Sequence, residues 1–177
     1  MAAFCGWGGM IHSNMAILET GALASHFTLL GLDGREYSIP GSLQGRPAVL
    51  VFCKTSCPTC DLAFPYFDRL REAYPEGWEL WAISQDAPDR SSDYAKRLGM
   101  TYPVLLDAPG FVASKLYDPP ATPTVFVVGR DGRVEYATHG FAKDDMNEIA
   151  TRIAGHVGME AVVIAPEEDG NPAFKPG

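Results

Sequence analysis

The chain lacks a secretory signal of the usual kind. Its first basic residue is Arg35, so a positively charged amino-terminal region is missing, and Gly6, Gly8 and Gly9 interrupt any apolar stretch there. No apolar run approaches the roughly 20 residues that a bilayer-spanning helix needs. These absences favour a soluble, cytoplasmic protein; if a leader has been removed from the sequence, a periplasmic or other extracytoplasmic location follows instead.

The composition also has no excess of positive charge and few cysteines. A formal net charge of −8 argues against general nucleic-acid binding and against attraction to an anionic membrane surface. The four cysteines stand at positions 5, 53, 57 and 60, and three of them are crowded together, so they do not form a disulfide framework. With 177 residues and 46% hydrophobic content, the chain predicts one domain with a sizeable core.

What is present is an apolar run that leads directly into a pair of cysteines. Residues 48–52 are apolar and rich in branched side chains, which is typical of an interior strand. Thr55 and Ser56 can then cap a helix, and from Cys57 onward the apolar residues fall on one helical face. That face consists of Leu62, Ala63, Phe67, Leu70 and Tyr74.

The two cysteines of Cys57-Pro58-Thr59-Cys60 are predicted to act as a redox pair. Cys57 lies at the start of the predicted helix, where free N–H groups and the helix dipole stabilise a thiolate, so its pKa should be lowered. Cys60 lies one turn further on and on the same side, close enough to form a disulfide with Cys57. We therefore expect Cys57 to be the nucleophile and Cys60 the resolving thiol.

Two prolines extend this pattern. Pro65 follows Cys57 by eight residues, and Pro123 stands about sixty residues downstream in Ala121-Thr122-Pro123-Thr124, at the start of another apolar strand. The combined pattern resembles the thioredoxin superfamily, and within it the TlpA/ResA-like thiol–disulfide oxidoreductases of the redoxin (AhpC/TSA-like) branch. The resemblance implies an α/β fold, with a central mixed β-sheet flanked by helices. It also implies that Pro123 is a cis-proline that faces the redox pair and belongs to the catalytic site.

The resemblance further implies where a substrate binds, because the cis-proline of this family helps to hold an extended peptide. The candidate substrate-binding residues are Thr122, Ser56, Pro58 and Thr59. The implied partners are a disulfide-bearing protein substrate and a thiol reductant or oxidant that recycles the protein. No organic cofactor or metal is required, and the sequence does not indicate an oligomeric state.

The domain organisation follows from the patterning along the chain. Residues 1–20 form a poorly patterned N-terminal extension, and residues 21–158 form the thioredoxin-like domain. Residues 159–177 form a C-terminal tail whose polar, glycine- and proline-rich end is predicted to be mobile.

Within the domain, alternation in residues 22–39 around an Asp-Gly turn predicts a β-hairpin at the sheet edge. A strand at 102–107 and a short helix at 110–117 match the strand-helix insertion of the TlpA-like group. Further elements are a strand at 78–84, a helix at 89–98, a hairpin at 124–138 and a closing helix at 143–156.

The chain departs from its relatives at both usual proton acceptors. Thioredoxins carry an aspartate six residues before the first cysteine, where this chain has Val51, and ResA-like proteins carry a glutamate three residues after the second, where it has Ala63. Without a base, Cys60 should keep a high pKa, because desolvation disfavours its thiolate. Resolution is then expected to be slow, or to use a water molecule, Asp61 or another carboxylate.

Three neighbouring features are open to two interpretations. Cys53 is predicted to be a small buried hydrophobic residue rather than a redox group, and Cys5 is assigned no role. Lys54 either favours the Cys57 thiolate or is a solvated lysine at a strand end.

The function predicted from the sequence is thiol–disulfide exchange with protein disulfides. One alternative is a peroxiredoxin-like thiol peroxidase, whose cysteine is oxidised to a sulfenic acid. The expected proline and threonine ahead of the peroxidatic cysteine are absent, however. Another alternative is a thiol-based metal- or protein-binding module, although zinc requires four ligands and no second Cys/His pair has suitable spacing.

Overall fold

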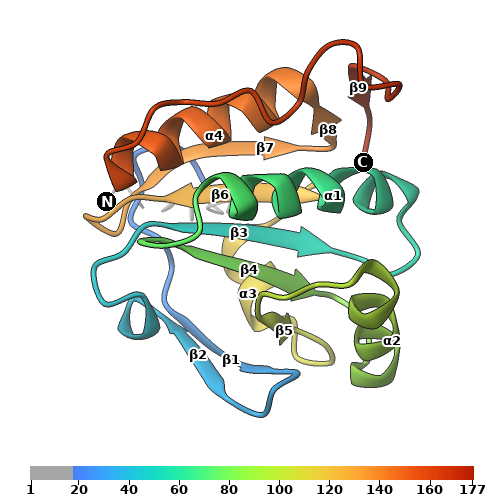
Figure 1. The fold of residues 1–177 in the computed structure, drawn as a ribbon. Coiled ribbons are helices and arrows are strands. Elements are labelled where there is room, and N and C mark those ends of the chain that lie inside the picture. Colours follow the sequence, from blue (N-terminus) through green and yellow to red (C-terminus); the bar gives the residue numbers. More distant parts are fainter. Residues whose placement is uncertain (1–17) are drawn as a thin grey trace, which may run out of the picture.

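The computed structural model describes residues 18–177 (Figure 1). Cys5 and most of the predicted N-terminal extension lie outside the described residues. Seven strands form one mixed sheet in the order β2-β1-β5-β4-β3-β6-β7. Their bounds are β1 Phe27–Gly31, β2 Glu36–Ile39, β3 Ala48–Cys53, β4 Glu79–Ser84, β5 Val104–Leu106, β6 Thr124–Val128 and β7 Val134–His139. The helices are α1 Pro58–Ala73, α2 Pro88–Leu98, α3 Val112–Tyr117 and α4 Lys143–Val157, with a 3-10 turn at Gly41–Leu43.

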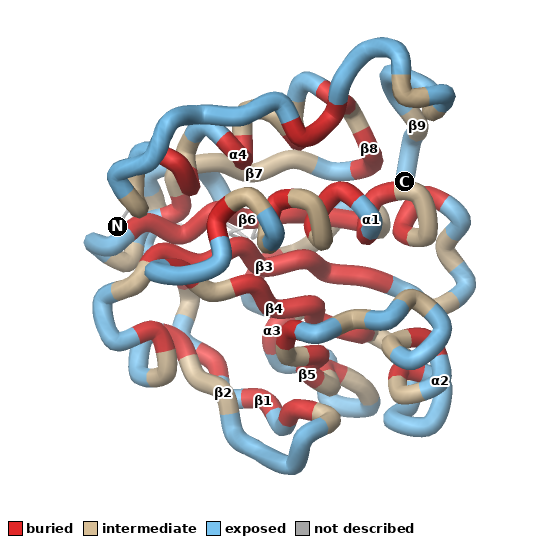
Figure 2. Tube along the Cα trace, viewed as in Figure 1, coloured by how far each residue is buried: buried red, intermediate tan, exposed pale blue. Residues whose placement is uncertain are grey.

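Strand β3 is the centre of the molecule, as its apolar sequence predicts. It pairs in parallel with β4 and antiparallel with β6, and all six of its residues are buried. Because side chains alternate across a strand, Val49, Val51 and Cys53 face one side and Leu50 and Phe52 face the other. Both faces of β3 therefore lie inside apolar cores (Figure 2).

The two cores are covered by different helices. The core on the Val51 side packs against the apolar faces of α1, α2 and α4, and the core on the Leu50 side packs against α3. Around Tyr117 of α3, the rings of Phe27, Phe52 and Phe126 lie with centroids 5.1–5.8 Å away. This arrangement confirms the predicted α/β architecture of a mixed sheet flanked by helices.

The predicted hairpin and insertion are both present. Strands β1 and β2 pair antiparallel at one edge of the sheet, with Phe27 opposite Ile39. Strand β5 and helix α3 form the insertion, and β5 joins β1 to β4. Pro65 lies inside α1 without ending it, and its side chain is exposed.

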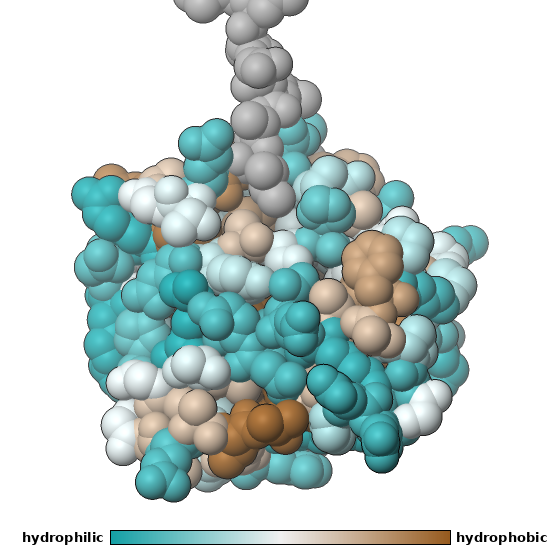
Figure 3. Space-filling model, turned by 90° about the horizontal axis from the view of Figure 1, so that it is seen from above, coloured by the Kyte–Doolittle hydropathy of each residue, from teal (hydrophilic) through white to brown (hydrophobic). Residues whose placement is uncertain are grey.

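The C-terminal tail follows a defined path in the structure. It passes over α4 and α1, and its two-residue strand β9 (Phe174–Lys175) pairs with β8 (Phe141–Ala142) (Figure 1). The view from above shows a mostly hydrophilic surface with few hydrophobic side chains (Figure 3). The exposed large hydrophobic residues of the tail are Met159, Val162, Val163 and Phe174.

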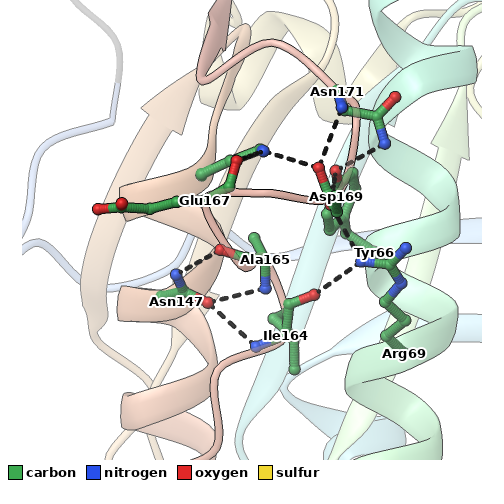
Figure 4. Close-up of polar contacts among 9 residues, drawn as sticks. Tyr66, Arg69, Asn147, Ile164, Ala165, Glu167, Asp169 and Asn171 are labelled. Atoms are coloured by element: carbon green, nitrogen blue, oxygen red, sulfur yellow. Dashed lines mark hydrogen bonds and ion pairs between the residues drawn. The ribbon is translucent and has the colours of Figure 1, made fainter.

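The tail's course has a physical cause in buried polar contacts that its composition did not reveal. The amide of Asn147 in α4 accepts from the N–H groups of Ile164 and Ala165 and donates to the Ala165 carbonyl, at 2.9–3.1 Å. Asp169 pairs with Lys143 at 2.7 Å (Figure 4 shows Asp169 within this network). The mobility expected from the sequence remains a prediction, because it concerns motion rather than position.

Candidate active site

The loop between β3 and α1 is held in place by contacts from the neighbouring strand. The Asp86 carboxylate accepts a 2.7 Å hydrogen bond from the Thr55 N–H, and the Gln85 N–H donates to the Cys53 carbonyl at 3.0 Å. The turn closes with a bond from the Cys57 N–H to the Lys54 carbonyl at 3.2 Å. Asp86 was not identified from the sequence, because it lies 31 residues from Thr55 along the chain.

Cys57 is the N-cap of α1. Its backbone is extended (φ −92°, ψ 111°), its sulfur accepts the Cys60 N–H at 3.2 Å, and its carbonyl accepts the Asp61 N–H at 3.2 Å. Pro58 occupies the first helical position, where a missing N–H carries no penalty. The side chain of Cys57 is therefore fixed at the helix start, as predicted, and it remains partly exposed.

This environment favours the Cys57 thiolate. Partial burial opposes ionisation, but hydrogen bonds that involve Thr122, Cys60 and the backbone of Thr59 outweigh it, so the pKa of Cys57 lies below its ordinary value. As a thiol, Cys57 also donates to the Thr122 carbonyl at 3.0 Å. An ionised sulfur no longer donates that bond, so the N–H groups at the helix start then supply its stabilisation.

Cys60 has the opposite environment. It is fully buried in the core beneath α1, and its burial, followed by the proximity of Cys53, raises the pKa of its thiol. Burial likewise raises the pKa of Cys53, which behaves as the predicted buried hydrophobic residue. Val51 and Ala63 are fully buried in the same core, and neither provides a proton acceptor because their side chains are aliphatic. The three cysteines within residues 18–177 are free thiols.

The second motif lies directly against the first. The Thr122–Pro123 peptide bond is cis, and the Thr122 carbonyl is the atom that the Cys57 thiol contacts across 65 residues of chain. The loop is braced by the Gly140 N–H, which donates to the Pro123 carbonyl at 2.8 Å, and by the Thr124 hydroxyl, which donates to the Ala121 carbonyl at 2.7 Å. The fold thus brings together Cys57, Thr122 and Pro123.

The candidate substrate-binding residues differ in accessibility. Ser56 and Pro58 are exposed, and Thr122 is half-buried. Thr59 is buried, with only 3% of its surface accessible, and its hydroxyl donates to the carbonyl of Pro176 in the tail at 2.7 Å. Sequence reasoning missed this tail contact, since 117 residues separate the two partners.

An open cavity adjoins the other side of the redox loop. Its volume is about 610 Å³, and Lys54 and Ser56 of the redox loop form part of its rim. The remaining lining residues are Gln85, Asp86, Phe111, Ser114, Lys115, Asp118 and Pro119. Lys54 is exposed to solvent at this rim.

Two features are absent from residues 18–177. This part of the chain has no group of three or more His, Cys, Asp or Glu side chains placed to hold a metal ion. No helix in it is both long and apolar enough to cross a bilayer.

Comparison with known proteins agrees with this geometry. The sequence profile described as the AhpC/TSA family matches residues 20–137, which is well over half of the chain. The chain belongs to the AhpC/TSA family. Among similar proteins is the thiol-disulfide oxidoreductase ResA of Geobacillus thermodenitrificans, 29% identical over 148 residues, which cover 80% of this chain and 84% of the relative. ResA of Geobacillus kaustophilus is 30% identical over 146 residues, or 78% and 83% of the two chains.

Solved structures support the same family assignment. A thiol:disulfide interchange protein DsbE from Chlorobium tepidum matches with a TM-score of 0.72 over 80% of this chain and 99% of the other; at 24% identity it shows the shared fold. A secreted Mycobacterium tuberculosis disulfide oxidoreductase, 26% identical, matches with a TM-score of 0.60 over 73% of this chain and 95% of that one. This member of the AhpC/TSA family is a ResA-like thiol–disulfide oxidoreductase of the thioredoxin superfamily.

The comparisons give no support to the cytoplasmic location expected from the sequence. The Mycobacterium tuberculosis structure is described as that of a secreted protein, and another relative, from Mycobacterium bovis, is named a soluble secreted antigen.

Proposed function

We propose that this oxidoreductase exchanges protein disulfides through Cys57 as the attacking thiol and Cys60 as the resolving thiol. The contrast between the two sulfurs carries the proposal. The Cys57 sulfur is partly exposed and accepts the Cys60 N–H at the start of α1, whereas Cys60 is fully buried. A thiolate is the nucleophile in disulfide exchange, so the sulfur with the lowered pKa and the open approach attacks first.

The reaction runs in two displacements. The Cys57 thiolate attacks one sulfur of the substrate disulfide, forming a mixed disulfide and releasing the other substrate sulfur as a thiolate, which takes up a proton. Cys60 then loses its proton and attacks the Cys57 sulfur, which breaks the mixed disulfide and releases the second substrate thiolate. The substrate thus gains two electrons as the Cys57–Cys60 bond forms. A separate thiol reductant then reduces this disulfide again. In the reverse direction, the same steps oxidise a dithiol substrate.

Deprotonation of Cys60 is the slow part of this scheme. Burial raises its pKa, and Val51 and Ala63 offer no base. Asp61, the next residue in α1, is paired with Arg97 at 2.9 Å at the surface. We assign the proton to a water molecule or to Asp61, two of the three acceptors that the sequence left open, and we expect a long-lived mixed disulfide.

Thr122 and Pro123 are proposed to hold the backbone of the substrate beside the attacked bond. The Thr122 carbonyl lies 3.0 Å from the Cys57 sulfur, so a peptide that pairs with this loop would present its disulfide to Cys57. Ser56 and Pro58 form the exposed rim on the other side. The partners are accordingly a protein disulfide and a recycling thiol or disulfide.

Replacement of each cysteine tests the roles. Cys57→Ser is expected to abolish turnover of a protein disulfide such as insulin, because no other described thiol is both exposed and activated. Cys60→Ser is expected to accumulate a mixed disulfide with the substrate, seen as a covalent adduct by intact-mass measurement that a reductant removes. Cys53→Ala is the matched control and should keep turnover, since Cys53 is buried in the core.

Full turnover by the Cys57→Ser protein would contradict the assignment of the nucleophile. Rapid consumption of hydrogen peroxide, with little disulfide turnover, would favour the peroxidase alternative. Tight stoichiometric metal binding, with no reversible Cys57–Cys60 disulfide, would favour the binding-module alternative.

The site of action proposed here is extracytoplasmic, the location that the sequence analysis retained for a chain whose leader has been removed. The similar proteins described as secreted support it. Fractionation of the source cells tests it, and recovery of the protein in the cytoplasm alone would contradict it.

A further inference from the structure

The last residues of the chain lie against the redox site. The Pro176 carbonyl accepts a 2.7 Å hydrogen bond from the hydroxyl of Thr59, one of the two residues between the cysteines. Gly177 lies beside the loop that precedes the cis-proline: a Cβ atom added to Gly177 would be 2.8 Å from the Thr122 carbonyl oxygen. That same oxygen is the one that the Cys57 thiol contacts. The tail end therefore touches both halves of the proposed active site.

The backbone of the tail end passes very close to the backbone at Gly140. A Cβ atom on Gly140 would lie 2.9 Å from the Lys175 carbonyl oxygen and 3.1 Å from the Gly177 nitrogen, and φ at Gly140 is +75°. The Lys143 N–H also donates to the Ala173 carbonyl at 2.9 Å, next to the short β8–β9 pairing. The end of the tail, which includes the two-residue strand β9 (Phe174–Lys175), thus lies against Thr59, Thr122 and Gly140, a surface that we call the groove.

The tail is attached to the domain upstream of this strand. Asp169 pairs with Lys143 at 2.7 Å and with Arg69 at 3.3 Å, and it accepts a hydrogen bond from the Tyr66 hydroxyl (Figure 4). The Asn171 side chain donates to the same Tyr66 hydroxyl at 2.9 Å. The six residues that follow can leave the groove without disturbing these contacts, because none of the contacts involves them.

We propose that residues 172–177 are a resident peptide in the substrate groove, which a disulfide-bearing protein segment must displace in order to pair with the Thr122 loop. This inference rests on the proposed function, because it uses the same groove beside Cys57. It identifies the substrate segment as one that pairs as a strand, as Phe174–Lys175 of the tail do with β8. Small disulfides, which need only the exposed Cys57 sulfur, do not compete with the tail.

Competition between the tail and a protein substrate should lower the apparent affinity for the substrate by a measurable factor. A tethered peptide has an effective concentration in the millimolar range, so even a weakly binding tail occupies its groove most of the time. If the groove is open for about one fifth of the time, the apparent affinity for a protein substrate falls about fivefold. Deletion of the tail end should therefore lower KM for protein disulfides and leave kcat nearly unchanged.

The test compares the full chain with a variant that lacks residues 172–177 and so keeps Asp169 and Asn171. We expect KM for insulin reduction to fall about fivefold and the rate with hydroxyethyl disulfide to stay within about twofold of the full chain. A matched variant replaces the same six residues with a glycine-serine segment of equal length and should behave like the deletion. Val163→Ala, which changes an exposed side chain of the tail upstream of these residues, should behave like the full chain.

A binding measurement keeps the test independent of turnover. A fluorescent peptide with the sequence of residues 171–177 should bind the deletion variant that also carries Cys57→Ser and Cys60→Ser, and should bind the corresponding full-length variant more weakly. An unchanged or raised KM on deletion, or equal peptide binding by both variants, would overturn the proposal. If the unaltered protein reduced neither insulin nor hydroxyethyl disulfide, that result would instead refute the proposed function itself.

Discussion

At the scale of single residues, two cysteines one helical turn apart have opposite properties. Cys57 stands at the free N–H groups of the helix start, and its pKa is lowered; Cys60 is fully buried, and its pKa is raised. The difference arises from position alone, because both side chains have the same chemistry. This contrast supports the proposed roles of Cys57 as the attacking thiol and Cys60 as the resolving thiol.

The lowered pKa of Cys57 predicts a pH dependence. In the Cys60→Ser protein, the rate of alkylation of Cys57 by iodoacetamide should rise with pH, with a midpoint below the pKa of about 8.5 that is typical of a free thiol. The sign follows because a lowered pKa completes thiolate formation at lower pH. The same protein in denaturant is the control and should follow the unperturbed profile; identical profiles in both states would contradict an activated Cys57.

Local sequence predicted the positions of the two cysteines on α1 and the cis bond well, and the surrounding contacts poorly. Cys57, Cys60 and the cis bond before Pro123 were predicted because each belongs to a short motif. Asp86 and Pro176 were not, because their contacts with Thr55 and Thr59 join distant parts of the chain and involve only ordinary polar groups. Composition records how many such groups exist, but it does not record where the fold brings them.

At the scale of elements, the insertion shows how a short helix is held. Helix α3 has six residues, too few for a stable helix in isolation. The buried carboxylate of Asp107, at the end of β5, accepts the N–H groups of Ala113 and Ser114 at 2.9 Å each. Tyr117 then anchors the other end of the helix in the core. The helix therefore depends on contacts made from outside its own sequence.

Removal of this carboxylate should weaken the insertion. Asp107→Ala leaves the N–H groups of Ala113 and Ser114 without their partner, and we expect a loss of about 1 kcal/mol in the free energy of unfolding, measured by urea denaturation. Asp107→Asn retains one carbonyl acceptor and should lose less. Equal stability of the Ala variant and the original protein would show that the carboxylate does not stabilise α3.

Strong hydrophobic patterns explain which elements the sequence predicted. The apolar run of β3 and the one-sided pattern of α1 each gave an element close to its observed bounds. The closing helix predicted at 143–156 appears as α4, Lys143–Val157. Strand β9 was not predicted, because two residues within a polar, proline-rich tail form a strand only through their partner β8.

At the scale of the whole molecule, one buried ion pair connects the tail to the domain. Lys143 is 5% exposed, and its ammonium group lies 2.7 Å from Asp169. The hydrogen bond from Lys143, and to a lesser extent the one from Tyr66, holds the pKa of Asp169 well below the ordinary value for aspartate. Removing one partner of such a pair leaves the other charge buried and uncompensated.

Asp169→Asn should therefore lower the melting temperature near neutral pH, because Lys143 loses its counter-charge. A carboxylate with a depressed folded-state pKa stabilises above its unfolded pKa, about 3.9, and loses that contribution as pH falls further. The difference between the variant and the original protein should thus shrink below about pH 4. Glu168→Gln, the same charge change at an exposed neighbour, should have little effect at any pH.

The two-residue pairing of β8 with β9 has a consequence for how the molecule fluctuates. So short a ladder opens at a small fraction of the free energy that unfolds the buried centre of the sheet. The amide of Lys143, which donates to Ala173, should accordingly exchange with deuterium far sooner than the amides of β3. The groove beside the redox site would then open many times during the life of one folded molecule, at a rate set by the tail and independent of the substrate.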